Sequence, residues 1–410
     1  MAAKNESTFV GLDIGTSKVA CVVGLHQDDM AEPSIIGLGV AQTTGLRRGT
    51  VVDIEETVGS ITSALEEAER MSGVTIEHAT ISVDGAHIQS LNSRGVIAVS
   101  RADKEISRED LARVEEAAAA IQMDSNRQIL QVIPKSYTVD GQINVADPVG
   151  MNGVRLEVDT HIITAASPAM KNLTNAVFRA GIAIDDQLLV PLASARAVLT
   201  KRQMELGVVL IDIGAETTGI AVFEEGGIVL TTILPVGSNH ITKDLVYGLR
   251  TNIDVADKLK LAHGSAQRDK ARAHTKVDLA DFGGSGVVTL GEVDKIIASR
   301  CEEIFTMAAT ELRRGGKDSM LAGGAVLTGG GANLKGIADV AQGILKLNVA
   351  IAAPRGFGGI SDKVKDPAYA AAVGLMLVDM HHAPATHGGL NNVIGNTVGQ
   401  LKGFFKNLLP

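Results

Sequence analysis

The chain carries the same strand–turn–strand pattern twice, once near its N-terminus and once just past its middle. The first copy is Val10–Gly24 (VGLDIGTSKVACVVG) and the second is Val209–Phe223 (VLIDIGAETTGIAVF), each with apolar strands around an Asp-Ile-Gly core. The copies align without a gap, which places residues 13–15 on residues 212–214. A duplicated pattern in a long chain predicts two similar domains, and we expect both turns to face one cleft.

The turn of each copy is rich in small residues and hydrogen-bond donors. In the first copy, Gly15-Thr16-Ser17-Lys18 offers backbone N–H groups, two hydroxyls and one ammonium. Phosphate oxygens require such donors, and only a turn of small residues lets the backbone approach them closely. Two such turns that close on a phosphate chain from opposite sides would clamp a nucleotide. One turn alone is equally compatible with an ordinary glycine-containing hairpin of a β-sandwich.

A third glycine-rich segment fits the same site. Ala325–Gly331 (AVLTGGG) is an apolar strand that runs into three glycines, followed by Ala332-Asn333-Leu334 and a predicted helix. Because glycine has no side chain, this backbone can lie flat against a planar base or a sugar. Many strand-to-helix turns are rich in glycine, so the segment supports the site only beside the two hairpins.

Composition restricts the class of protein. The chain has 410 residues, 45% of them apolar, which favours a globular protein of more than one domain. A net charge of −9, 3% aromatic residues and the lack of Trp argue against nucleic acid as a partner. Cys21 and Cys301 are too few for a disulfide framework or a zinc site. The polar N-terminus and the short apolar runs predict no signal peptide and no membrane span, hence a cytoplasmic protein.

Residues 84–159 differ in pattern from their surroundings and are interpreted as a small inserted α+β unit. Ser107, with Asp110 three residues later, predicts the start of a helix over 107–122. Farther along, apolar residues at helical spacing predict a long amphipathic helix over Leu290–Arg314. The strands expected in and just after the insert are His87–Leu91, Val96–Val99, 129–140, 153–158 and Thr160–Ala166.

The C-terminal segment differs from the rest of the chain in composition and pattern. Residues 381–390 have the composition of a linker, and residues 391–410 form one apolar stripe at helical spacing without any acidic side chain. A detached amphipathic helix of positive charge is typical of a membrane-surface anchor for anionic lipids, and the alternative is a helix that packs on its own domain. The residues expected at the membrane are Leu401, Lys402, Phe404, Phe405, Lys406, Leu408 and Leu409.

Three motifs together resemble the actin-like ATPase superfamily, which also contains the 70-kDa chaperones and sugar kinases. They are DIGTSK (13–18), IDIGAETTGIAVF (211–223) and LTGGGANLKGI (327–337), in this order.

Within that superfamily the chain is similar to the FtsA family of bacterial cell division proteins. The resemblance implies an α/β, actin-like (ribonuclease H-like) duplicated fold with two lobes around a nucleotide cleft and an inserted small α+β subdomain. The segments that carry it, besides the C-terminal helix, are LRRGTVVDIEE (46–56), TISVDGAHIQSLNSRGVIAVS (80–100), PVGSNHITKDL (235–245) and DKLKLAHG (257–264).

The resemblance also implies a division of the chain. We expect subdomain 1A, interrupted by the insert 1C, then subdomain 2A, interrupted by 2B, and finally the linker and the membrane-targeting helix. The expected bounds are 1–83 plus 160–204 for 1A, 84–159 for 1C, 205–245 plus 306–380 for 2A, 246–305 for 2B, 381–390 for the linker and 391–410 for the helix.

The same resemblance assigns ATP and Mg²⁺ to the cleft. Asp13 and Asp212 are expected to hold Mg²⁺ through waters, because carboxylates suit that cation. The residues expected to contact the nucleotide are Gly15, Thr16, Ser17 and Lys18 in the first phosphate turn, Asp212, Gly214, Ala215, Thr217 and Thr218 in the second, Gly237 and Asn239 at the cleft wall, Asp257 and Lys260 near the ribose and base, and Gly329, Gly330, Gly331 and Asn333 in the adenosine motif.

Glu216 departs from the family pattern, because it stands where the family usually has Gly. A carboxylate aimed at the phosphates would repel them. Glu216 therefore either points outward, or occupies the position that activates water, or marks slow or absent hydrolysis. It is the one candidate catalytic residue, and whether the protein is an enzyme stays open, with slow ATP hydrolysis as the upper expectation.

As a member of this family, the chain would polymerise into filaments and anchor the ring of the tubulin-like protein FtsZ to the cytoplasmic membrane. It would lie on the inner face of the membrane at the division site, and bind the C-terminal peptide of FtsZ and other division proteins. Arg300, on the predicted long helix, is expected to pair with an acidic group of that peptide, and the alternative is an ordinary solvated surface charge.

Other functions on the same fold give distinct expectations. A small-molecule kinase needs a catalytic base and a substrate pocket between the halves, and no residue beyond Glu216 suggests itself. A chaperone needs a large C-terminal substrate domain, which residues 381–410 cannot form. An adaptor like the pilus-platform protein PilM would lack the free amphipathic tail.

Overall fold

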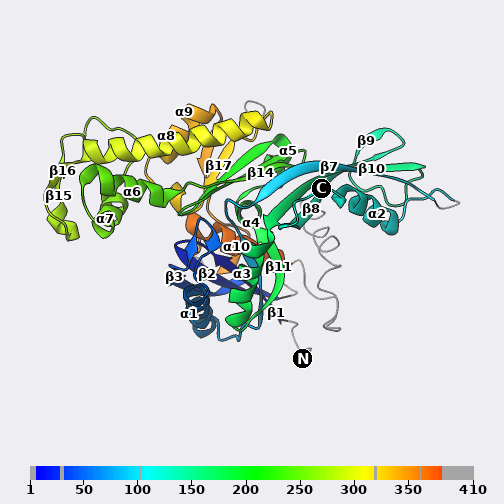
Figure 1. The fold of residues 1–410 in the computed structure, drawn as a ribbon, viewed down its shortest axis with the longest axis horizontal. Coiled ribbons are helices and arrows are strands. Elements are labelled where there is room, and N and C mark those ends of the chain that lie inside the picture. The colour runs from blue at the N-terminus through cyan, green and yellow to red at the C-terminus, as the bar shows by residue number, and fades with distance from the viewer. Residues whose placement is uncertain (1–5, 28–31, 101–102, 318–320, 361, 381–410) are drawn as a thin grey trace.

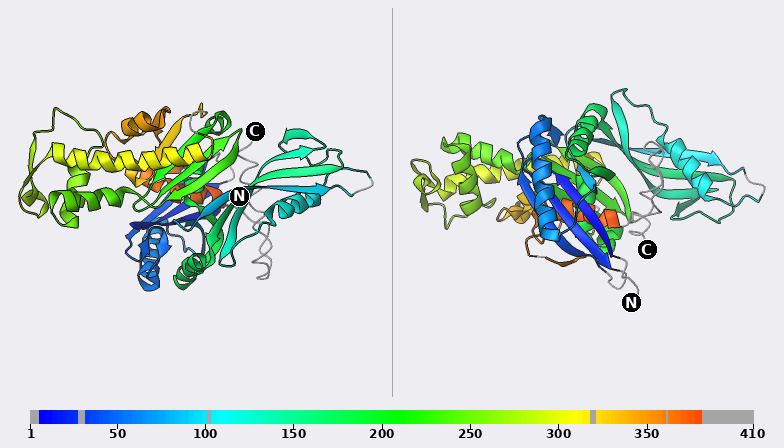
Figure 2. Two further views of the ribbon diagram at one scale, coloured as in Figure 1. Left: turned by 45° about the horizontal axis from the view of Figure 1, so that its top comes forward. Right: turned by 90° about the horizontal axis from the view of Figure 1, so that it is seen from below.

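Two mixed β-sheets form the centre of the molecule, and each is built around one copy of the repeated hairpin. Figure 1 shows the fold from a computed structural model, which describes residues 6–27, 32–100, 103–317, 321–360 and 362–380. A third sheet, formed by the insert, extends to one end of the molecule. Helices α6, α7 and α8 extend to the opposite end (Figures 1 and 2).

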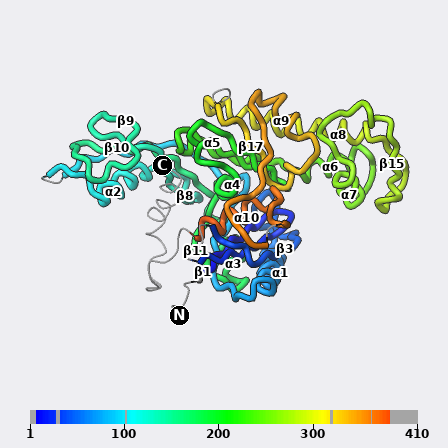
Figure 3. The backbone as a smooth tube through the Cα atoms, turned by 180° about the vertical axis from the view of Figure 1, so that it is seen from behind, coloured from blue at the N-terminus to red at the C-terminus, as the bar shows by residue number. Residues whose placement is uncertain are grey.

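The first sheet has the strand order β11-β6-β1-β2-β3-β19. Its central strands are buried on both faces, because helices α1 and α3 cover one face and α10 covers the other (Figure 3). This explains why these strands are continuously apolar. The elements are β1 (Glu6–Ile14), β2 (Lys18–Gln27), β3 (Ser34–Gln42), β6 (His78–Val83), β11 (Ala183–Leu189), β19 (Gly358–Gly359), α1 (Ile54–Ser72), α3 (Ser167–Arg179) and α10 (Ala370–Asp379), with the small ribbon β4 (Leu46–Arg47) and β5 (Thr50–Val51) beside the first turn.

The second sheet has the strand order β14-β13-β12-β17-β18. Its hairpin has the register of the first one: Ile14 lies opposite Val19, and Ile213 lies opposite Thr218. The duplication predicted from the sequence is thereby confirmed. The elements are β12 (Val208–Ile213), β13 (Thr218–Glu224), β14 (Gly227–Leu234), β17 (Ala325–Thr328), β18 (Val349–Ile351), α5 (Lys201–Leu206), α9 (Ile337–Leu345) and the 3-10 turns η2 (Gly330–Asn333) and η3 (Pro367–Tyr369).

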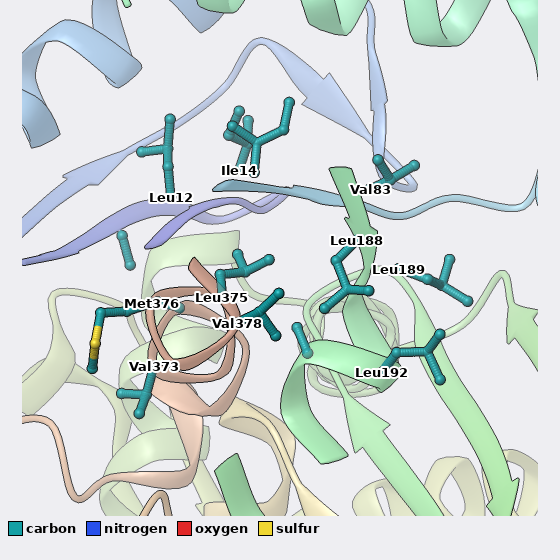
Figure 4. Packing of buried hydrophobic residues seen from close by; sticks show 14 of the residues in the cluster. Leu12, Ile14, Val83, Leu188, Leu189, Leu192, Val373, Leu375, Met376 and Val378 are labelled. Atoms are coloured by element: carbon teal, nitrogen blue, oxygen red, sulfur yellow. The ribbon is translucent and has the colours of Figure 1, made fainter. Parts of the chain in front are cut away.

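Two short helices, α4 (Val190–Val198) and α10, cross between the sheets, and each packs on the sheet of the other half of the chain. Helix α10 lies against β1 and β6, while α4 contacts β12 and β13. Figure 4 shows Leu375 on the side of α10 that faces Leu12 and Ile14 of β1. A Cβ on Gly374 would lie 1.8 Å from the carbonyl oxygen of Ala193, so the helices meet backbone to backbone. The sequence analysis assigned no helix to the residues of α4.

The insert is a four-stranded antiparallel sheet with one helix on its face. The prediction of separate strands at 87–91 and 96–99, and again at 153–158 and 160–166, was wrong, because in each case one long strand runs through. Strand β10 is buried along most of its length, polar residues such as Thr160 and His161 included, whereas β7 is mostly exposed, so neither strand shows the simple alternation that marks a strand in a sequence. The sheet order is β7-β10-β8-β9, with β7 (Gln89–Ala98), β8 (Arg127–Val139), β9 (Gln142–Val145), β10 (Arg155–Ala166) and α2 (Arg108–Ala119), whose N-cap is Ser107 as predicted.

The insert also contacts the edge strand β14 of the second sheet through a seam of polar residues. His161 is buried, with its ring nitrogens 2.7 Å from Asn92 Oδ1 and 2.8 Å from Thr231 Oγ1, and Ser90 Oγ donates to the Thr231 carbonyl at 2.6 Å. Burial lowers the pKa of His161 to about 4, with a smaller effect from Lys135. The ring is therefore neutral at physiological pH, and the insert is attached to both halves of the chain.

The opposite end of the molecule consists of helices around the long helix α8, which spans Leu290–Arg314 as predicted. Thr289 caps α8 in a capping box with Glu292, which satisfies the first free N–H groups. Among the described residues, none of the helices combines the length and apolar character needed to cross a bilayer. The expected linker and membrane helix, 381–410, lie outside the described residues. The other elements here are α6 (Ser238–Leu249), α7 (Ile253–His263), β15 (Lys276–Asp278), η1 (Leu279–Phe282) and β16 (Val287–Thr289).

The crossing of α4 and α10 predicts that Gly374 cannot be replaced by a larger residue without a loss of stability. We expect Gly374→Ala to lower the free energy of unfolding by about 2–4 kcal/mol, because the new methyl must push two helix backbones apart. Gly343→Ala is the matched control: this glycine also lies inside a helix, but no atom lies within 4 Å of its added Cβ. Thermal and denaturant unfolding of both variants would measure this. Equal stability of the two would contradict the role of the crossing.

Candidate functional site

Both hairpin turns open into one cleft between the two sheets, with a cavity of about 670 Å³. The cleft predicted from the duplication is therefore present in the structure. The residues expected from the sequence that line it are Asp13, Gly15, Thr16, Ser17, Lys18, Asp212, Gly214, Ala215, Thr217, Asn239, Asp257, Lys260, Gly329, Gly330, Gly331 and Asn333.

The first turn is closed by a hydrogen bond from the Gly15 N–H to the Lys18 carbonyl, at 3.0 Å. Thr16 Oγ1 accepts from the N–H of Gly49 at 3.1 Å, so the β4–β5 ribbon holds the turn from outside. The Lys18 ammonium lies over the ring of Tyr369, 3.8 Å from its centroid. The turn thus presents its donors to the cavity from a fixed backbone.

The second turn repeats this geometry and is attached to the first half of the chain. The Gly214 N–H donates to the Thr217 carbonyl at 2.9 Å, the same closure as in the first turn. Thr217 Oγ1 donates to Asp84 Oδ2 at 2.5 Å, and Ser194 of α4 donates to the Asp212 carboxylate. The two halves of the chain are therefore joined by hydrogen bonds at the base of the cleft.

Three carboxylates meet at this base, and their burial makes the charged form costly. Burial raises the pKa of Asp13 to about 6, against the effects of a Ser82 hydrogen bond and the Lys18 charge. Burial likewise raises the pKa of Asp212 to about 7, helped by the charges of Asp13 and Asp84. The pKa of Asp84 is also raised by burial, and its Oδ1 is a buried atom without a hydrogen-bond partner. Such a group would be relieved by a cation or its water shell.

The glycine turn closes the cleft on the side of the second sheet. Gly329 has a φ of +79°, and a Cβ there would lie 2.2 Å from Asp212 Oδ1, so both the backbone conformation and the space require glycine. A Cβ on Gly330 would meet a single neighbour, the Ala368 methyl at 3.6 Å. Gly330 therefore exposes bare backbone to the cavity.

Polar side chains mark the far end of the cleft. Lys260 Nζ donates to Asp257 Oδ1 at 2.6 Å and to Thr242 Oγ1 at 2.7 Å, so the predicted acid–lysine pair is formed on one face of α7. Asn333 Nδ2 donates to Asp366 Oδ1 at 2.8 Å, which fastens η2 to η3. A ligand that reached from the hairpin turns to these groups would meet carboxylate, ammonium and amide in turn.

Two expected contact residues lie beside the cavity rather than on its wall. Thr218 is fully buried and donates from its hydroxyl to the Val236 carbonyl at 2.7 Å. Gly237 precedes α6, and its close approach to the second turn lets the next two N–H groups, of Ser238 and Asn239, donate to that turn. Both positions therefore support the second turn from behind.

Glu216 and Arg300 are both held in ion pairs away from the cavity wall. Glu216 accepts from Lys243 Nζ at 2.8 Å and from the N–H of Arg48 at 3.0 Å. Although burial acts to raise the pKa of Glu216, these two partners outweigh it and hold the pKa below its usual range. Arg300 donates to both oxygens of Asp244, at 2.6 and 2.9 Å, and to Glu303.

Sequence reasoning missed several residues that complete the site. Asp84 and Ser194 contact the second turn or its aspartate, and Tyr369 contacts Lys18. Asp84 directly follows a buried strand and precedes a glycine, which was a usable signal. Ser194 and Tyr369 lie in or next to the crossing helices, where no local pattern indicates a site.

Two lobes of like topology, with a matched pair of turns facing one cleft, define an actin-like protein. Solved structures agree. A chain of the "PilM-PilN type IV pilus biogenesis complex" superimposes with a TM-score of 0.67 at 16% identity, covering 90% of this chain and 97% of that one. MreB5 of Spiroplasma citri bound to ADP gives 0.54 at 14% identity, covering 91% and 96%. At such identities the likeness shows the fold alone.

Sequence relatives narrow the class to one family. The model described as "Cell division protein FtsA" matches residues 209–374, and that described as "SHS2 domain inserted in FTSA" matches residues 85–164. Proteins named cell division protein FtsA are 42% identical in Bacillus subtilis (91% of this chain, 83% of the relative), 38% in Pseudomonas aeruginosa (90% and 88%) and 33% in Escherichia coli K12 (94% and 92%). The chain belongs to the FtsA family of cell division proteins.

Family membership decides between the alternatives that the sequence left open. A PilM-like adaptor and a small-molecule kinase share the fold with FtsA, so the structure by itself does not separate them. The identity to FtsA over most of the chain does separate them, as the resemblance of the motifs had indicated.

The raised pKa of Asp212 predicts a pH-dependent stability in protein free of nucleotide and metal. Between the ordinary value of 3.8 and about 7, the folded state holds a proton that the unfolded chain has released. The stability that this proton supplies is complete below pH 3.8 and is lost as the pH rises through 7. Asp212→Asn stays neutral, so its stability relative to wild type should rise by about 1.4 kcal/mol per pH unit across this range.

Unfolding curves at pH 5, 6, 7 and 8 would measure the difference between the two proteins. Asp362→Asn makes the same change at an exposed position and is the matched control. A constant difference for Asp212→Asn would show that its carboxylate is ordinary.

Proposed function

We propose that the cleft binds ATP with Mg²⁺, and that the bound nucleotide fastens the two lobes in one closed conformation. The single observation that carries this is the meeting of both hairpin turns and the three-glycine turn around one cavity. The turns offer N–H donors and hydroxyls to a phosphate chain, and Gly330 offers bare backbone to a ring. The MreB5 neighbour, whose structure holds ADP, supports the same assignment.

The residues present suit a magnesium ion held through waters. Asp13, Asp84 and Asp212 supply carboxylate oxygens, and the unpartnered Asp84 Oδ1 marks a missing hydrogen-bond donor. In the described part of the chain, no three such side chains are close enough to hold a metal directly. Mg²⁺ usually keeps several of its waters in proteins. When bound, Mg²⁺ would neutralise phosphate charge, while Lys18 and the turn N–H groups orient the oxygens.

The closed conformation would then act as an adaptor in division rather than as a metabolic enzyme. We propose that it associates with further copies into a filament and that residues 391–410 attach the filament to anionic lipid on the inner face of the membrane. Many tails on one filament bind far more firmly than one, because later contacts are effectively intramolecular. The proposed division of the chain keeps 84–159 and 246–305 as the two small subdomains given by the sequence, although β10 and α8 each run across one of these bounds.

By family analogy, the helical end around α8 would bind the C-terminal peptide of FtsZ. Arg300 is the proposed contact, and its present partners Asp244 and Glu303 show that the guanidinium already binds carboxylates there. An acidic peptide group would exchange with one of them. Because Glu216 is likewise paired outside the cavity wall, we infer that hydrolysis, if it occurs, is slow.

Nucleotide binding is tested by two variants that should leave the fold intact. We expect Lys18→Ala to weaken binding of a fluorescent ATP analogue with Mg²⁺ by about 10- to 100-fold, since a charge-assisted contact is lost. Gly330→Ala should also weaken it, because its methyl fits the free protein but fills space at the ligand. Gly343→Ala, far from the cleft, is the control. Wild-type protein that retains no nucleotide, or equal retention by all variants, would refute the proposal.

The membrane anchor is tested by deletion of residues 391–410. Full-length protein should sediment with vesicles that contain anionic lipid, and the truncated protein should remain in the supernatant, since the apolar stripe and its lysines are gone. Phe404→Ala with Phe405→Ala should give an intermediate result, and neutral vesicles should bind the full chain less. Equal sedimentation of the truncated chain would show that the tail is no anchor.

A further inference from the structure

The contact between Lys18 and Tyr369 is a feature of the cleft that neither the motifs nor the family match assigns. The ammonium lies 3.8 Å from the centre of the tyrosine ring, over its face. An aromatic face attracts a cation through its quadrupole, but it carries no net charge and accepts no strong hydrogen bond. The ring therefore fixes the ammonium without neutralising it and leaves its N–H donors free.

A carboxylate partner would have the opposite effect. Among the ion pairs of the described residues none includes Lys18. Burial lowers the pKa of its ammonium, and the nearby carboxylates of Asp13, Asp366 and Asp212 offset part of that effect. A salt bridge would hold the ammonium as well as the ring does, but a phosphate would then have to break it. The aromatic partner holds the ammonium at the wall of the cavity without a carboxylate that a phosphate would have to displace.

Tyr369 is itself fixed to the glycine turn of the other lobe. Its N–H donates to the Asp366 carbonyl at 3.0 Å, and the Asp366 side chain accepts from Asn333 at 2.8 Å. In the same 3-10 turn, the Pro367 carbonyl accepts from the N–H of Gly329 at 3.1 Å. The ring is half-buried against the first core, so its position is set by packing as well as by these bonds.

We propose that Tyr369 is a positioning residue, which holds the Lys18 ammonium at the cleft for a phosphate-bearing ligand and links that cation to the glycine turn. This rests on the proposed nucleotide function. The ligand class is specific: Tyr369 should matter for the polyphosphate and not for the nucleoside, because its effect passes through the ammonium alone. A residue that merely supported the fold would affect both kinds of ligand.

The test is a double-mutant cycle on full-length protein. Tyr369→Leu removes the aromatic face at similar bulk, and Tyr369→Phe keeps it; each is made in wild type and in Lys18→Ala. Affinities for ATP, ADP and adenosine are measured by competition against a fluorescent nucleotide with Mg²⁺ present. We expect Tyr369→Leu to weaken ATP and ADP about five- to tenfold and adenosine less than twofold. Tyr369→Phe should stay within twofold for all three.

In the Lys18→Ala background, Tyr369→Leu should have no further effect on ATP. Melting temperatures show whether each variant still folds. Tyr369→Phe keeps both the packing and the ring, and its affinities are compared with those of Lys18→Ala, which loses the ammonium. An equal loss in both backgrounds, or an equal loss of adenosine, would make the role structural and overturn the proposal. Wild-type protein that binds ATP, and loses affinity in Lys18→Ala but not in Tyr369→Leu, would overturn this inference alone. Wild-type protein that binds none of the ligands would overturn the nucleotide function itself.

Discussion

The crossing of α4 and α10 holds this molecule together. Each helix leaves its own half of the chain and packs on the sheet of the other half, so neither lobe can complete its core alone. Small residues make the crossing possible: Gly374 meets the backbone of Ala193, Gly11 receives α10, and Gly219 receives Pro191 of α4. Because helices packed this closely cannot slide without clashes, the crossing fixes where the two hairpin turns stand.

The cleft exists because this crossing joins the lobes only at their base. Above it, the two turns present donors, and three carboxylates are gathered on the wall of the cavity. Burial raises the pKa of each of these carboxylates, so their charged forms are costly, and a bound cation would relieve that cost. Lys18 brings the opposite charge to the same site, and its ammonium lies over an aromatic ring rather than beside an acid.

The insert and the helical end extend this two-lobed centre in opposite directions. The insert is part of the first half of the chain, yet it is bonded to β14 of the second half through His161, Ser90 and Thr231. A change in the angle between the lobes would therefore act on the insert as well as on the cleft. Glu216 makes a second connection, since it joins the Arg48 backbone of one lobe to Lys243 of the other.

The sequence by itself determined the duplicated hairpins, the glycine turn, the family and the long helix at 290–314, because these depend on patterns within a few residues of one another. It also placed most of the cavity wall, since the turns that form it are local structures. Only the tertiary structure decided that two strands of the insert run unbroken, that Glu216 is paired outside the cavity wall, and that Asp84, Ser194 and Tyr369 belong to the site. These facts depend on which distant segments pack together, and packing between Gly11 and α10, or Ala193 and Gly374, leaves no periodic trace in the chain.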